Sequence, residues 1–191
     1  MDKVTKRHII KVPINISIYY CTQKNIILIS NSFTQKLLKL KTKLIIQHSK
    51  KLIKITREPV VNFSNHEKKK LKSIQSTYAA LLKQVFLEMS LFFCKKLNLI
   101  GVGYRVFLLN IGKIDILHFK LGHSHSIYFK VPQNLKFFCL KSNKLFIVGN
   151  SYSFVTQIAA LIKSYKMPEP YKGKGILYAT EKIVLKEGKK I

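Results

Sequence analysis

The feature that most constrains the fold of this chain is a diverged internal repeat. Residues 43–55 read KLIIQHSKKLIKI and residues 136–148 read KFFCLKSNKLFIV, and the two segments align without a gap at an offset of 93. Each has two β-rich runs around a polar turn, which is the pattern of a β-hairpin. Farther along, AALLK at 79–83 matches AALIK at 159–163, both in helical contexts. Two elements repeated at this distance predict duplicated domains rather than a solenoid.

The segments before each hairpin have the same plan. KNIILIS precedes the first hairpin and KIDILHFKLG precedes the second. Each half therefore consists of strands followed by one helix, which predicts an α+β fold with an antiparallel or mixed sheet and one packed helix per domain. We expect the domains to span residues 1–93 and 94–191, because KKLNLIGVGYRVFL begins a new strand after the long helix.

Helical spacing predicts one long and one shorter helix. The first should span about residues 65–92, with Ser64 or Asn65 as N-cap and Glu67 in the first turn. Its inward residues should be Ile74, Tyr78, Leu81, Leu82, Val85 and Met89. The second helix should span about residues 152–166 and end before Pro168. Its inward residues should be Val155, Ile158, Ala159 and Ile162.

The charge of the chain indicates a polyanionic partner. Lysine and arginine total 35 against 8 acidic residues, a formal net charge of +27. Such an imbalance repels itself unless a polyanion neutralises it, so nucleic acid is the first candidate partner and an anionic membrane the second. A hydrophobic content of 47% is sufficient for a packed core.

Composition and the N-terminus also bear on the compartment. Arginine is rare while lysine, isoleucine, phenylalanine and asparagine are common, a bias typical of AT-rich genomes such as those of organelles. The start, MDKVTKRHIIKVPINISIYY, lacks the character of a presequence. We therefore expect an organelle-encoded protein of the mitochondrion, with a plastid or the bacterial cytoplasm as alternatives.

Motifs for catalysis, cofactors and metals are weak. GVGYR at 101–105 is followed by Val106 where a dinucleotide fingerprint needs its third glycine, so a bulge or close approach is the better interpretation. His123 and His125 have no third ligand nearby in sequence. The acidic residues are dispersed, and the cysteines show no C-x-x-C spacing, which favours reduced thiols. We expect no enzyme activity, no catalytic residues, no cofactor and no bound metal.

The segment KMPEPYKGKGILY, residues 166–178, is the best candidate for a binding site. Its prolines favour an extended path, and its glycines allow close backbone approach. Tyr171 offers a ring for stacking, and Lys172 and Lys174 would point the same way in an extended segment. This combination suits recognition of an RNA backbone. The lysine cluster EKKKLKS at 67–73 would be a supplementary contact or a solvated helix face.

PEPYKGKGI at 168–176 resembles the C-terminal signature of the large-subunit ribosomal protein L6 family, as do LIGVGYRV, KLGHSHSI and the whole stretch from residue 157 to 190. The resemblance implies two duplicated domains, no catalysis, and binding of large-subunit rRNA near the sarcin-ricin loop and the base of the factor-binding stalk, beside neighbouring ribosomal proteins. The RNA-binding residues it implies, with Arg105 added as a candidate phosphate contact, are Lys163, Lys166, Pro168, Glu169, Pro170, Tyr171, Lys172, Gly173, Lys174, Gly175, Lys186, Lys189 and Lys190.

Two other functions remain compatible with the residues. One is a non-ribosomal RNA-binding module, such as a subunit of an RNA-modifying enzyme. The other is a basic peripheral membrane protein that uses the helix at 65–93. The membrane alternative requires an exposed apolar helix face, whereas the repeat predicts that this face packs on a sheet.

Overall fold

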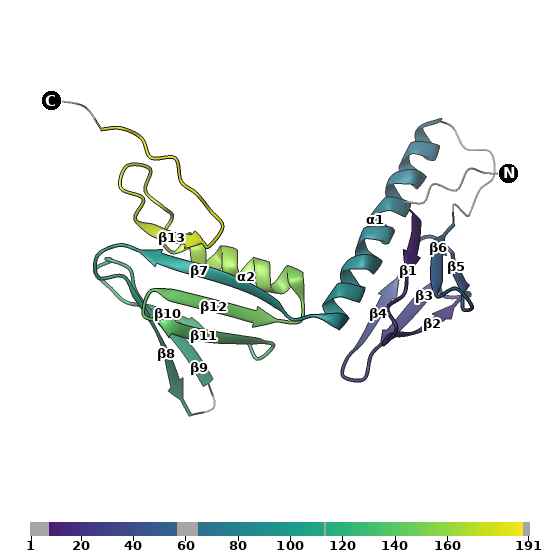
Figure 1. The fold of residues 1–191 in the computed structure, drawn as a ribbon, viewed down its shortest axis with the longest axis horizontal. Helices are drawn as coiled ribbons and strands as arrows, with labels where there is room; N and C mark the ends of the chain where they lie inside the picture. The colour runs from purple at the N-terminus through teal and green to yellow at the C-terminus, as the bar shows by residue number, and fades with distance from the viewer. Residues whose placement is uncertain (1–7, 57–64, 113, 189–191) are drawn as a thin grey trace. The chain divides into compact units, whose positions relative to one another are not determined.

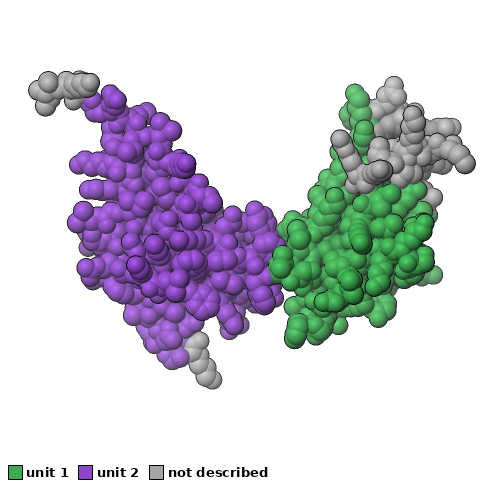
Figure 2. Space-filling model, in the orientation of Figure 1, with its two compact units in different colours: residues 1–91 green, residues 92–191 purple. Residues whose placement is uncertain are grey.

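The computed structural model of the chain describes residues 8–56, 65–112 and 114–188. It divides into two compact units, Met1–Leu91 and Phe92–Ile191 (Figure 1 and Figure 2). The expected boundary lay two residues later, after residue 93. Neither described helix has the length and apolarity to span a membrane.

Unit 1 contains six described strands followed by one helix. Its elements are β1 (Ile9–Lys11), β2 (Ser17–Cys21), β3 (Ile26–Ser30), β4 (Gln35–Lys39), β5 (Leu44–Gln47), β6 (Leu52–Ile55) and α1 (Asn65–Ser90). They form two sheets with strand orders β1-β6-β5 and β2-β3-β4, and every pair of neighbouring strands is antiparallel. Short turns join most of these neighbours, so the sheets are built largely from hairpins.

Unit 2 repeats this order and adds one strand. Its elements are β7 (Phe93–Ile100), β8 (Arg105–Ile111), β9 (Ile114–Lys120), β10 (Ile127–Lys130), β11 (Leu135–Lys141), β12 (Lys144–Gly149), α2 (Tyr152–Ser164) and β13 (Gly175–Tyr178). The sheet orders are β11-β12-β7-β13 and β10-β9-β8. Strands β7 to β12 thus correspond to β1 to β6, and α2 corresponds to α1. The predicted duplicated α+β fold is confirmed.

The hairpins of the repeat correspond less simply than the gapless alignment implies. Leu44 pairs with Ile55 in unit 1, and the corresponding pair in unit 2 is Phe137 with Ile147. The first strands keep the offset of 93, but the second strands are offset by 92, because the register of β11 shifts between Cys139 and Lys141. A slip of one residue exchanges the two faces of a strand. The gapless alignment therefore put the second strand of the hairpin on the wrong face.

Of the predicted inward residues of α1, Leu82, Val85 and Met89 are buried, Ile74 and Tyr78 are partly buried, and Leu81 is exposed. That side chain is 39% exposed, whereas its neighbour Leu82 is fully buried. Successive helical residues lie about 100° apart, so Leu82 falls within the buried face of α1 while Leu81 falls at its edge. Gln75, Ala79 and Phe86 are buried and were not predicted. The helix ends at Ser90, and its predicted alternative cap, Ser64, lies outside the described residues.

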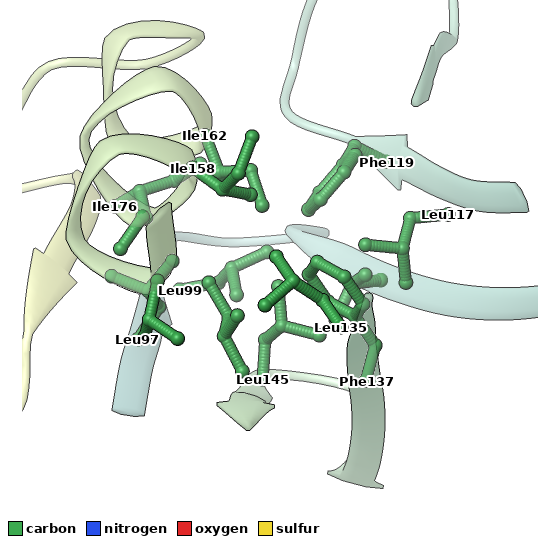
Figure 3. Packing of buried hydrophobic residues seen from close by; sticks show 14 of the residues in the cluster. Leu97, Leu99, Leu117, Phe119, Leu135, Phe137, Leu145, Ile158, Ile162 and Ile176 are labelled. Atoms are coloured by element: carbon green, nitrogen blue, oxygen red, sulfur yellow. The ribbon is translucent and has the colours of Figure 1, made fainter. Parts of the chain in front are cut away.

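All four predicted inward residues of α2 are buried, which confirms the phase of this helix. They pack against a core from both sheets of unit 2. Figure 3 shows Ile158 and Ile162 of α2 facing Phe119 and Leu117 of β9, above residues from β7, β11 and β12. The arrangement fixes the C-terminal end of α2 beside β7, and this end leads directly into the segment that was predicted to bind RNA.

Candidate nucleic-acid interface

The candidate interface begins where α2 ends. Tyr165 and Lys166 form a turn in which their backbone N–H groups donate to the carbonyls of Ile162 and Lys163. The ring of Tyr165 packs edge-on against Phe119, and burial raises the pKa of its hydroxyl. The helix therefore ends at Ser164, four residues before Pro168, and the core holds Tyr165, the first residue after the helix.

Residues 166–174, here called the arm, form a closed loop and not the extended segment that the sequence suggested. The N–H of Glu169 donates to the carbonyl of Lys174 at 3.0 Å, and the N–H of Gly173 donates to the carbonyl of Glu169 at 2.9 Å. Gly173 has a φ of +66°, in the region that favours glycine. Two fixed proline φ angles and this glycine allow the chain to turn back on itself without a regular element.

Gly175 was expected to let the backbone approach a phosphate, but the structure shows a different reason for a glycine here. The residue is buried, with a φ of +156°. A Cβ atom on it would lie 2.6 Å from Cα of Pro168. The missing side chain therefore lets the two ends of the arm come together.

Strand β13 fixes the arm to the sheet of unit 2. It pairs with β7 along four residues, and the N–H of Ile176 donates to the carbonyl of Lys166. Both Ile176 and Leu177 are buried. Because the arm is held at both ends by core elements, its lysines are presented from a defined position rather than from a free tail.

The described residues after β13, 179–188, are here called the tail, and they lie along the arm (Figure 1). The N–H of Lys186 donates to the carbonyl of Pro170 at 3.0 Å. Leu185 lies beside Gly173, where a Cβ atom would be 3.3 Å from its Cδ2. Arm and tail therefore form one surface. Lys189 and Lys190 lie outside the described residues.

The cations of this surface differ in what they contact. Lys172 and Lys186 are exposed, and Lys166 and Lys174 are partly buried. Within the described residues, none of these four forms an ion pair with an acidic side chain. Unpaired ammonium groups on an ordered loop are available for phosphates. Glu169 and Pro170, also predicted, are exposed at the turn of the arm.

Lys163 behaves differently from the other predicted contacts. Its Nζ lies 2.6 Å and 2.8 Å from the two carboxylate oxygens of Glu181, and 4.9 Å from the ring centre of Tyr178. The hydrogen bonds from Lys163 lower the pKa of Glu181 below its ordinary value, with a further bond from the N–H of Tyr178. Lys163 thus joins α2 to the residues after β13. Nothing in the sequence indicated Glu181 as its partner.

Tyr171 is 55% exposed at the tip of the arm. Its ring is absent from the hydrophobic cluster of unit 2 and from the ring pairs among the described residues. This exposure leaves the ring free to stack on a base, as the sequence suggested, and argues against a role in the core.

A hollow of about 310 Å³ lies between the loops after β7 and β9. One of its lining residues, His123, places Nε2 at 3.3 Å from the carbonyl oxygen of Tyr165. The ring of Tyr104 fills the space that a side chain on Gly101 would need, so close approach explains the GVGYR motif. In the described part of the chain, no three histidine, cysteine or acidic residues gather as a metal site.

Arg105 does not belong to the arm surface. It is the exposed first residue of β8 and pairs with Lys120 of β9, on the other sheet of unit 2. Lys120 also lines the hollow between the loops after β7 and β9. The structure thus brings together most of the predicted contacts and places Arg105 on the other sheet of unit 2.

These observations define a class of protein: a duplicated α+β chain, strongly basic, whose added strand carries an ordered loop of unpaired lysines. Such a chain has the features of a nucleic-acid-binding protein. The sequence profile described as Ribosomal protein L6 matches residues 100–179, which include β8 to β13 and the arm.

Relatives extend the match to the whole chain. The large ribosomal subunit protein uL6 of Mycoplasmoides gallisepticum is 35% identical over 189 residues, covering 99% of this chain and 97% of the relative. The uL6 of Chlorobium limicola is 42% identical over 64% of this chain and 66% of its own. The uL6m of Prototheca wickerhamii is 39% identical over 68% and 73%. The chain belongs to the ribosomal protein L6 family.

Proposed function

We propose that this chain is a structural constituent of the large ribosomal subunit and binds large-subunit rRNA through the arm and tail of unit 2. The observation that carries the proposal is the full-length match to a protein named for the large ribosomal subunit, together with an ordered loop of unpaired lysines inside the matched region. The net charge of +27 supports a polyanionic partner for the same surface.

Binding by the arm is dominated by phosphates and not by base edges. The side chains it presents are mainly ammonium groups, which act as point charges and read no sequence. The closed backbone lowers the entropy lost when these groups dock. Tyr171 adds a ring that can stack on an unpaired base.

The resemblance of the arm to the family signature supports a finer placement. On that basis the arm contacts rRNA near the sarcin-ricin loop and the base of the factor-binding stalk, and neighbouring ribosomal proteins complete the site. The lysine-rich composition, with a relative of the uL6m type, supports a mitochondrial ribosome. Codon usage and the genetic neighbourhood of the gene test the compartment.

The test of the RNA site is a charge reversal in the arm. The variant Lys172→Glu with Lys174→Glu should keep the parent melting temperature but fail to enter large subunits, because two negative charges then face phosphates. A matched control is Lys39→Glu with Lys41→Glu, which reverses two exposed lysines of unit 1 at the same spacing. Equal loss in both variants would show diffuse attraction instead of an arm-specific site.

Salt dependence provides the second readout. Each neutralised phosphate contributes a slope of roughly 0.7 to 0.9 in log affinity against log salt. We expect a steep dependence for the parent chain and a shallower one after reversal of the arm lysines. A flat dependence for the parent would contradict phosphate-dominated binding.

A further inference from the structure

The outer face of the β10-β9-β8 sheet carries a row of aromatic rings. Phe107 and Tyr128 are the cross-strand partners of His118 on either side. The His118 and Tyr128 rings are 4.9 Å apart at an interplanar angle of 11°, and the Phe107 and His118 rings are 6.1 Å apart. The core is on the other face, where Leu117 and Phe119 are fully buried. The ring row is therefore separate from the packing of unit 2.

The row is open at one end. Strand β10 is the edge of its sheet, so none of the described strands covers the side of Tyr128 away from His118. Tyr128 is 63% exposed. Cross-strand aromatic pairs stabilise a sheet, which accounts for the Phe107–His118 contact. That role does not account for a large ring left mostly in solvent at the end of a near-parallel stack.

Cations surround the row on the same face. Side chains two residues apart on a strand point the same way, so Arg105 shares the face of Phe107, Lys120 that of His118, and Lys130 that of Tyr128. All three cations are exposed. Asp115, the acidic residue of these strands, has the opposite parity to His118.

Unit 1 shows that the fold does not require these rings. The corresponding row there is Tyr19, Leu28 and Leu37, aligned by the same strand pairing. It has one ring and two aliphatic side chains. Two copies of one sheet thus differ in the chemistry of the same surface positions.

We propose that the ring face of unit 2 is a second RNA-binding surface, on which an unpaired nucleobase stacks against the open side of Tyr128. Stacking on aromatic side chains with nearby cations is how proteins hold single-stranded RNA without reading its sequence. Arg105, Lys120 and Lys130 hold the adjoining phosphates. The inference rests on the proposed function for the identity of the polyanion, but it uses none of the arm residues.

The test uses the absence of tryptophan from the chain. Tyr128→Trp introduces a single tryptophan at the end of the row, and a stacked base should quench its fluorescence. The probe is a single-stranded oligoadenylate added to the full chain. Tyr19→Trp is the matched control, because Tyr19 is 64% exposed on the corresponding row of unit 1. We expect saturable quenching at position 128 and none at position 19.

Affinity measurements test the ring itself. Tyr128→Leu keeps an apolar side chain but removes the ring, and should weaken oligoadenylate binding about 5- to 150-fold, the fold-change expected for one base–aromatic stack. Tyr128→Phe should retain parent affinity. Melting curves establish that the variants are folded.

A combined variant separates the ring face from the arm. When Lys172→Glu and Lys174→Glu are added to Tyr128→Trp, the oligoadenylate should still quench the tryptophan at position 128 to the same extent. Loss of RNA binding by the arm therefore leaves the quenching at position 128 unchanged, whereas loss of binding by the ring face abolishes it.

Two results would overturn the proposal. One is equal or absent quenching at positions 128 and 19. The other is unchanged oligoadenylate affinity in Tyr128→Leu. If Tyr128→Leu binds oligoadenylate like the parent chain but enters large subunits poorly, the ring face docks a neighbouring protein and not RNA.

Discussion

The two units have the same order of strands and helix, yet they differ in the segment after the helix. After α1 the chain passes directly into β7, whereas after α2 it forms the arm and returns as β13. Strand β13 pairs with the edge of β7. Strand β1 of unit 1 corresponds to β7, but among the described strands it pairs with β6 alone and has no counterpart of β13 beside it. The comparison shows that duplication supplied the fold, and that the candidate RNA site comes from a segment added to one copy.

The interiors of the units differ as well. All buried polar residues of the described chain lie in unit 1: His8, Thr42, Gln75 and Glu88. Gln75 occupies the helical position that Val155 has in unit 2. Glu88 is bonded to Lys36 and accepts a hydrogen bond from Gln84. Burial of a carboxylate costs free energy unless ion pairs or hydrogen bonds compensate it. The interior of unit 1 therefore depends on these polar contacts of Glu88, whereas the interior of unit 2 depends on apolar packing.

The largest expected effect is at the added segment. Gly175→Ala places a Cβ atom against Pro168 and requires a φ that other residues avoid. We expect about 1–3 kcal/mol from backbone strain and about 1–3 kcal/mol more from overlap, with loss of RNA affinity as the arm opens. Gly188→Ala is the control, because no atom lies within 4 Å of its Cβ position. If both variants melt and bind alike, the arm is not held through Gly175.

Paired truncations test whether each unit has its own core. Leu82 and Ile162 occupy corresponding positions on α1 and α2, and both are fully buried. Each change to alanine should cost ~2–5 kcal/mol. Hydrogen exchange should locate the loss in the unit that carries the change.

The neighbouring residues provide the controls for this pair. Leu81 is 39% exposed and Leu161 is 45% exposed. Leu81→Ala and Leu161→Ala should change stability by about 0.5 kcal/mol or less. A large effect at Leu81 would restore the original sequence-based assignment of the inward face of α1.

The two ion pairs should differ in strength. Lys36→Ala removes a cation from a carboxylate whose side chain is 3% exposed, and we expect a cost of about 1.5–3 kcal/mol. Lys163→Ala removes one from Glu181, which is 27% exposed, and we expect about 1 kcal/mol or less. Denaturant unfolding of both variants measures the difference. Equal costs would mean that burial of Glu88 has no energetic consequence.

The smallest effect concerns pH. The pKa of Glu181 is lowered in the folded chain, so its contribution to stability is complete above the ordinary carboxyl pKa. It should be lost as the pH falls through the lowered value. Melting temperatures of the parent and of Glu181→Gln should therefore converge at acid pH. A constant difference between them would show that the Lys163–Glu181 pair is not ionised as described.

The sequence was sufficient for the features that depend on local pattern. Helical spacing predicted the inward residues of α2 and most of those of α1, and the repeat predicted the hairpins and the duplicated fold. These predictions succeed because periodicity records which face of an element is buried. The signature at 168–176 located the arm because a motif of prolines, glycines and lysines is contiguous in the chain.

The remaining features depend on residues that meet from distant parts of the chain. The one-residue shift between the hairpins results from strand register, which an ungapped alignment cannot contain. The arm closes because Pro168 and Gly175 touch, and Lys163 is paired because the chain returns with Glu181 after β13. The ring row at the outer face of unit 2 arises from three strands in register. Local sequence specifies each element, but contacts between elements set which side chains are used in packing and which remain for RNA.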